Sequence, residues 1–181
     1  MKLMEVALRL FALIKKNKCK IMNRKINNIL KDEKLINEKA YQNFNNRIEN
    51  IKKKLNNFLS KNKNKKIIGY GASTKGNIVL NHCKIDYKKL KFICDANNIK
   101  SGLYTPGSNI KIISKTKMRK LNPDFLLILI WPFRKEIIKQ EKKFLEKGGK
   151  LVFHLPKFHI VDKRNYKFYL KSNFKQLSYK Y

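Results

Sequence analysis

Beyond residue 65, short apolar runs alternate with polar and glycine-containing segments, and this rhythm predicts alternating strands and helices. The run Phe125–Trp131 is almost wholly apolar, as is typical of a central parallel strand that helices cover on both faces. We expect strands at Lys66–Gly71, Leu90–Asp95, Ile110–Ile113, Phe125–Trp131 and Lys150–Leu155. We expect helices at Thr74–His82, from the capping Ser114 to Leu121, and at Phe133–Lys147. The pattern predicts a Rossmann-like α/β domain, an open and mainly parallel sheet with helices on both faces.

A single apolar stripe precedes the predicted sheet, with steps of three and four residues between its members. It consists of Tyr41, Phe44, Ile48, Ile51, Leu55 and Phe58. This spacing predicts a long amphipathic helix. The stripe is shorter than three full heptads, which favours packing against the neighbouring domain over a coiled coil.

The two ends of the chain are less regular. The segment Met1–Ile14 carries Glu5 and Arg9 inside an apolar stretch, so we expect a buried strand or short helix rather than a signal peptide. The segment Lys157–Tyr181 interleaves lysines with aromatic residues, which could stack on the bases of a nucleic-acid single strand. Docking of these aromatics on the body of the domain is the favoured interpretation.

The composition adds a strong positive charge. The 181 residues include 44 Lys and Arg and carry a net charge of +32, and lysine dominates along the whole chain. We expect nonspecific attraction of polyanions, whereas a sequence-reading nucleic-acid protein would favour clustered arginine. No apolar stretch reaches the ~18–20 residues of a membrane helix. Cys19, Cys83 and Cys94 are far apart, so we expect no zinc site, a buried role for the last two, and a reducing, cytoplasmic location.

The turn after the first predicted strand is the main candidate binding site. Two glycines permit a tight turn and close approach of a ligand, and the following helix offers free N–H groups to an anion. The third glycine of the dinucleotide fingerprint is absent, because Ser73 and Thr74 stand in its place, and the Walker order is absent too. The turn therefore predicts a binding site for a phosphate or nucleotide. The alternative is that the glycines only allow the chain to turn. The candidate residues are Gly69, Tyr70, Gly71, Ala72, Lys75, Gly76 and Asn77.

Two further loops follow strands whose carboxyl ends should share this edge, where open α/β sheets bind ligands. Asp95 ends the second strand, where such folds place an acid against a ribose hydroxyl. Trp131 stacks on a base or sugar, or else caps the core; both interpretations remain open. We expect His82 on the core side of its helix and find no catalytic constellation around the three histidines. The candidate residues of these loops are Asp95, Lys100, Tyr104, Pro106, Gly107, Trp131 and Phe133.

These motifs, in this order, resemble the C-terminal domain of the C-methyltransferases that modify nucleotide-linked deoxysugars. The matching stretches are Gly69–Ala72, Lys75–Asn77, Leu80–Cys83, Asp95, Lys100, Gly102, Tyr104–Gly107, Pro123–Asp124, Trp131, Phe133, Glu136–Ile137 and Gly148–Lys150. The helix over Tyr41–Phe58 resembles the family's linker helix. Leu8–Phe11 resembles the closing strand of its S-adenosylmethionine domain. We therefore expect an N-terminal arm (1–39), a linker helix (40–60), the C-terminal domain (65–157) and a basic aromatic tail (158–181).

The resemblance implies that the domain helps to hold a nucleotide-linked deoxysugar at the residues named above. The family's cysteine-rich zinc region and S-adenosylmethionine domain have no counterpart in the sequence before Lys66. We therefore expect no cofactor in this chain, with S-adenosylmethionine implied only through a methyltransferase domain or partner chain. The chain would act with that partner or persist as a remnant, without catalysis alone. The alternatives are a basic nucleic-acid-binding or scaffold protein and a small dinucleotide-binding enzyme.

Overall fold

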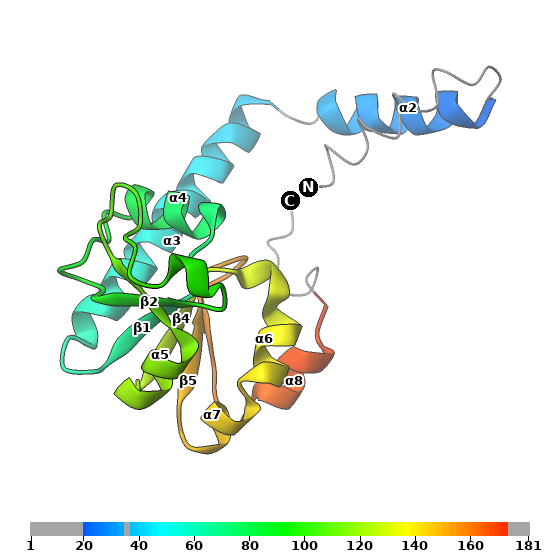
Figure 1. Ribbon diagram of the computed structural model, residues 1–181. Coiled ribbons are helices and arrows are strands. Elements are labelled where there is room, and N and C mark those ends of the chain that lie inside the picture. Colours follow the sequence, from blue (N-terminus) through cyan, green and yellow to red (C-terminus); the bar gives the residue numbers. More distant parts are fainter. Residues whose placement is uncertain (1–19, 35–36, 174–181) are drawn as a thin grey trace. The chain divides into compact units, whose positions relative to one another are not determined.

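The computed structural model describes residues 20–34 and 37–173, which fall into two compact units divided after Asn46. The first unit contains helix α2 (Lys20–Lys34) and the start of helix α3 (Glu38–Lys61). The second unit contains the rest of α3 and everything after it (Figure 1). The expected element in Met1–Ile14 lies outside the described residues. No helix in the described ranges combines the length and the apolarity that crossing a membrane requires.

A six-stranded sheet forms the centre of the second unit, with strand order β3-β2-β1-β4-β5-β6 (Figure 1). The strands are β1 (Ile67–Tyr70), β2 (Phe92–Asp95), β3 (Lys111–Ser114), β4 (Phe125–Ile128), β5 (Lys150–Phe153) and β6 (His159–Val161). The first five strands run parallel, and β6 pairs antiparallel with β5. The predicted Rossmann-like sheet is confirmed, and the antiparallel edge strand extends it.

Helices connect these strands and cover both faces. They are α4 (Thr74–His82), α5 (Lys115–Leu121), α6 (Arg134–Gln140), α7 (Lys142–Glu146) and α8 (Tyr166–Lys171), with single 3₁₀ turns η1 (Asn98–Lys100) and η2 (Trp131–Phe133). The helix that we expected over Phe133–Lys147 is present but divided at one residue, Glu141, into α6 and α7. The chain leaves helical geometry at Glu141, whose carboxylate is buried and paired with Arg119. The Tyr70 hydroxyl also donates to Glu141 Oε1 at 2.9 Å.

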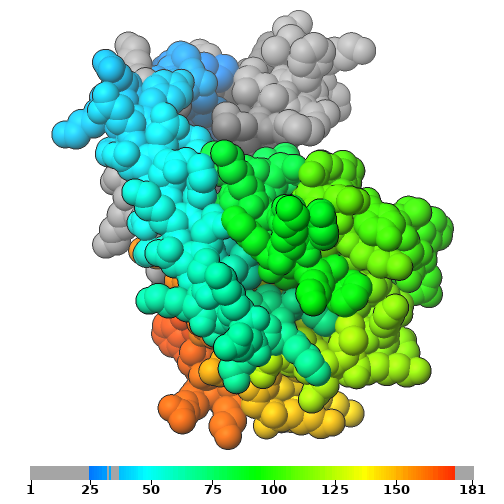
Figure 2. Space-filling view, turned by 90° about the vertical axis from the view of Figure 1, so that its left-hand side faces the viewer, coloured from blue at the N-terminus to red at the C-terminus, as the bar shows by residue number. Residues whose placement is uncertain are grey.

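Alternate residues of each strand feed two separate apolar cores, as the period-two geometry of a strand requires. On one face Leu127 and Val152 pack with Leu55 and Phe58 of α3 and Leu80 of α4. Figure 2 shows the second half of α3 alongside the α4 region on this face. A hydrogen bond also fixes the position of α3, because Asn56 Nδ2 donates to the Cys83 carbonyl at 2.9 Å.

The other face packs Ile68, Leu126 and Leu151 against α5, α6 and α7. The thiols of Cys83 and Cys94 are 3% and 0% exposed in the two cores, which confirms their predicted burial. The stripe of α3 is buried only towards its end. Leu55 and Phe58 are buried, whereas Tyr41 and Phe44 of the first unit are 61% and 52% exposed.

The segment after Pro156 docks on the domain as far as it is described. Tyr166, Tyr169 and Leu170 pack against the core that α6 covers. The buried Arg134 side chain donates from Nη2 to the Ser172 carbonyl at 2.7 Å, which ties the segment to α6. The interpretation that the aromatics dock on the body is thus confirmed for these residues.

Candidate functional site at the carboxyl edge of the sheet

The carboxyl ends of β1 and β4 lie side by side at the point where the connections of the sheet change direction. From β1 the chain proceeds to β2 and β3 on one side, and it then crosses back to β4 on the other. Open α/β sheets bind ligands in the crevice outside such a switch point. The residues at this switch point are Gly71 and Ala72 after β1, and Ile130 and Trp131 after β4.

The glycine turn lies against the end of β4 so closely that two positions exclude a side chain. Gly71 has φ of +90°, and a Cβ there would lie 2.6 Å from Ile130 Cγ2. A Cβ on Gly76, in the first turn of α4, would lie 2.7 Å from Leu129 Cβ. Ser73 occupies the place of the missing third glycine and caps α4, because its Oγ accepts from the Gly76 N–H at 3.0 Å. The departure from the fingerprint therefore has a structural role, which the sequence analysis missed.

Asp95 clamps this turn to the end of β2. Its Oδ2 accepts from the Ala72 N–H at 2.7 Å, and its Oδ1 accepts from the Asn97 N–H at 2.8 Å. Lys100 Nζ lies 3.7 Å from the same carboxylate and donates to the Ala72 carbonyl at 2.9 Å. Asp95 and Lys100 thus come together with the glycine turn, as we expected. The carboxylate holds the backbone, however, in place of the ribose contact that the fold pattern suggested.

The Tyr70 ring does not lie at the carboxyl edge. The side chain is 2% exposed and lies in the core beneath β1, where its hydroxyl meets Glu141. Burial, reinforced by the adjacent Glu141 carboxylate, raises the pKa of this phenol well above its ordinary value. Lys115 Nζ lies 4.9 Å from the centre of the ring. The Tyr70 side chain therefore cannot contact a ligand at this edge, and only the backbone groups of this candidate residue could do so.

Tyr104, Pro106 and Gly107 lie at the opposite end of the sheet, so their expected position at the carboxyl edge is wrong. The Gly102 N–H donates to the Ile112 carbonyl, and the segment then runs back antiparallel to β3 until Tyr104 pairs with Lys111. The Pro106 carbonyl accepts from Asn81 Nδ2 at 3.1 Å, beside the end of α4. The loop therefore leaves the carboxyl edge after Lys100 and returns to the amino edge.

The other candidates stay at the carboxyl edge. Lys75 lies exposed in the first turn of α4, and Asn77 is half-buried in the next. Phe133 is 59% exposed in η2. Trp131 is half-buried against the α6-side core, which favours the capping interpretation for most of its surface.

The position of His82 differs from our expectation, and His154 had no role in the sequence analysis. His82 is exposed at the end of α4, with Nε2 at 3.6 Å from Glu49 Oε1, so its expected place on the core side is wrong. His154 follows β5 and is 0% exposed, with its ring 4.9 Å from that of Trp131 in an edge contact. Burial lowers the pKa of His154 from 6.5 to about 4. Within the described residues, no three His, Cys, Asp or Glu side chains gather as a metal site would require.

Replacing Gly71 by alanine should destabilise the domain by at least about 2 kcal/mol, because the left-handed backbone and the Ile130 contact both oppose a Cβ. Gly102→Ala is the matched control. Its φ is +93° but no atom lies within 4 Å of the added Cβ. Urea unfolding should give a clearly smaller loss for the control, of about 1 kcal/mol. Equal losses would show that Ile130 does not constrain the turn.

His154 should make the domain less stable in mild acid. Between pH 6.5 and about 4 the unfolded chain binds a proton that the buried imidazole refuses, so stability falls as the pH drops through that window. The residue contributes up to about 1.4 kcal/mol per pH unit there. The variant His154→Leu, which keeps His159, should show a shallower pH dependence of its unfolding free energy than the unchanged chain. Parallel curves would contradict the burial of a neutral imidazole.

Comparison with known proteins places these features in a family. Residues 7–156 match the family described as the C-methyltransferase C-terminal domain. C-methyltransferase NovU from Streptomyces niveus is 37% identical over 97 residues, which are 54% of this chain and 23% of that protein. The chain thus matches about a quarter of the length of this relative. The family match covers most of the chain, including the five parallel strands, the glycine turn and the helix before it. The chain therefore belongs to the C-methyltransferase C-terminal domain family.

Proposed function

We propose that the carboxyl edge between β1 and β4 binds the diphosphate of a nucleotide-linked deoxysugar and presents the sugar to a methyltransferase domain. The observation that carries this proposal is the turn at Gly71. It brings bare backbone to the switch point and opens directly into α4, whose N-terminus favours an anion. The relative NovU is a C-methyltransferase, which supports a methyltransferase context for this chain.

Each residue at this edge has a distinct role in the proposal. The phosphates lie against the first turn of α4, with Lys75 as a mobile point charge. Lys100 adds a second ammonium group, held by the Ala72 carbonyl and partly balanced by the Asp95 carboxylate at 3.7 Å. Asp95 does not touch the ligand; it holds the Ala72 N–H and thereby keeps the turn open. The exposed Phe133 ring provides an apolar surface for the sugar or base.

The same geometry fits poorly with S-adenosylmethionine or a dinucleotide at this turn. Such folds direct the acid at this position to the ribose, whereas Asp95 accepts a backbone N–H group on each oxygen and has Lys100 Nζ at 3.7 Å. The side chain of Asp95 is only 14% exposed. We therefore assign S-adenosylmethionine and the methyl transfer to a partner chain or a separate domain. In the absence of such a partner, the chain would be a remnant that retains binding.

The buried thiols suit a reducing, cytoplasmic location for this module. Burial raises the pKa of the Cys94 thiol to about 12, so it remains an inert core group rather than a reactive thiolate.

Isothermal titration with a deoxythymidine-diphosphate-linked deoxysugar tests the proposal, with inorganic pyrophosphate as the reference ligand. The nucleotide sugar should bind more tightly than pyrophosphate. The double variant K75A/K100A should weaken its binding about tenfold, which corresponds to about 1.4 kcal/mol. The matched variant K139A/K143A removes the same charge from α6 and α7 and should leave binding nearly unchanged. Nucleotide-sugar binding no tighter than that of pyrophosphate, or equal losses in the two variants, would sink the proposal.

A further inference from the structure

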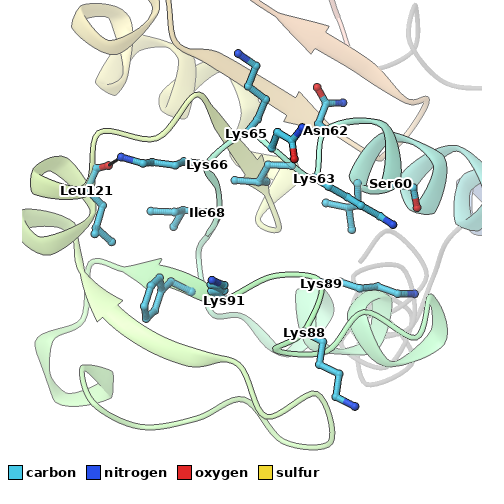
Figure 3. Close-up of a pocket in the computed structure, with 14 residues that line it drawn as sticks. Ser60, Asn62, Lys63, Lys65, Lys66, Ile68, Lys88, Lys89, Lys91 and Leu121 are labelled. Atoms are coloured by element: carbon cyan, nitrogen blue, oxygen red, sulfur yellow. Dashed lines mark hydrogen bonds between the residues drawn. The ribbon is translucent and has the colours of Figure 1, made fainter.

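A cavity of about 770 Å³ opens at the amino edge of the sheet, the end remote from the glycine turn. Its walls come from the turn after α3, the start of β1, the segment before β2 and the end of α5 (Figure 3). Ile67, Ile68, Phe92 and Leu121 form an apolar floor. This cavity plays no part in the function proposed above.

Lysines surround this opening. Six of the 14 lining residues are lysine and none is acidic, whereas Lys and Arg together make up 44 of the 181 residues. The lining therefore carries a formal charge of +6 with no acidic side chain among its residues. The six are Lys63, Lys65, Lys66, Lys88, Lys89 and Lys91.

Two of these lysines already stabilise the fold. Lys66 Nζ donates to the Leu121 carbonyl at the end of α5, at 3.4 Å. Lys89 Nζ donates to the Lys84 carbonyl at 2.8 Å and to Asn56 Oδ1 at 2.9 Å. Such contacts are typical of lysines near the C-terminal ends of helices and need no ligand.

The other four lysines have no such partner in the described part of the chain. Lys63, Lys65, Lys88 and Lys91 are exposed, and no ion pair joins them to an acid there.

Asp86 and Asp124 each hold a backbone N–H of a lining lysine. Asp86 Oδ1 accepts from the Lys88 N–H at 3.0 Å, and Asp124 Oδ2 accepts from the Lys66 N–H at 2.8 Å. Neither carboxylate forms an ion pair with a lining lysine in the described residues, and the six ammonium groups outnumber these two acids and repel one another around the apolar floor. The apolar walls have a low dielectric constant and therefore strengthen the positive electric field of these lysines. This field attracts anions.

We propose that this cavity binds an anion with two or more linked phosphate groups. The lysines stand on two separate rims, 63–66 and 88–91 (Figure 3), so one small anion would neutralise only part of the charge. A chain of phosphates reaches both rims and relieves the repulsion on each. Lysine suits this ligand because it acts as a mobile point charge for phosphate. Free condensed phosphate and the backbone of a nucleic-acid single strand share this chemistry.

Titration of the full chain with inorganic tripolyphosphate at about 0.15 M ionic strength, where exposed charges are screened beyond ~8 Å, tests the proposal. The variant K63Q/K65Q/K88Q/K91Q should bind at least about tenfold more weakly than the unchanged protein. The control K139Q/K143Q/K167Q/K171Q removes the same charge from α6, α7 and α8 and should weaken binding less than about twofold. Lys66 and Lys89 are retained because they stabilise the fold. Circular dichroism melts check that both variants remain folded.

Two further arms identify the source of the phosphates and separate this site from the first. A short oligothymidylate that displaces tripolyphosphate from the unchanged protein would identify a nucleic-acid backbone as the source, whereas failure to displace it would identify condensed phosphate. Equal weakening by the two quadruple variants, or orthophosphate binding as tightly as tripolyphosphate, would overturn the proposal. Nucleotide-sugar binding should survive in K63Q/K65Q/K88Q/K91Q, so failure at one edge is distinguishable from failure at the other.

Discussion

The close approach of the glycine turn to the end of β4 is the constraint on which the binding edge depends. Gly71 and Gly76 leave no room for side chains against Ile130 and Leu129, so α4 begins directly over the carboxyl end of the sheet. Asp95 fixes the other side of the turn by holding the Ala72 N–H. The bare backbone, the helix N-terminus and the Lys100 side chain therefore share one edge of the sheet. Each of these features exists without a ligand, so the edge is organised before binding.

The two edges of the sheet differ in how they handle charge. At the carboxyl edge, Lys100 is fixed by the Ala72 carbonyl and Asp95, so its positive charge is built into the turn. At the amino edge, Lys66 and Lys89 bind the carbonyls at helix ends, as the helix dipole favours. The other four lysines around the cavity there have no comparable role in the described structure. The excess of positive charge thus lies at the amino edge of the sheet, whereas a fold of this type ordinarily binds its ligand at the carboxyl edge.

The sequence allowed accurate prediction where local pattern decides the structure. The helix Thr74–His82 and the strands before and after it follow from apolar spacing and from the glycine turn. Predictions were wrong where distant contacts decide. The loop after Lys100 returns along β3 because Gly102 bonds to Ile112, a pairing that no local signal announces. The helix is interrupted at Glu141, whose carboxylate pairs with Arg119, 22 residues earlier in the chain.

The roles of individual polar side chains were the hardest to predict. Asp95 lies where we expected it. Its hydrogen-bond partner, however, is the Ala72 N–H, whereas we expected a ligand, and only the folded geometry distinguishes the two partners. Backbone amide shifts on titration with a deoxythymidine-diphosphate-linked deoxysugar give the most direct measurement of which edge binds. The account predicts shifts concentrated at residues 71–77, 95–100 and 130–133, with residues 104–107 unchanged. Shifts centred on residues 104–107, or confined to the lysines of the amino edge, would contradict it.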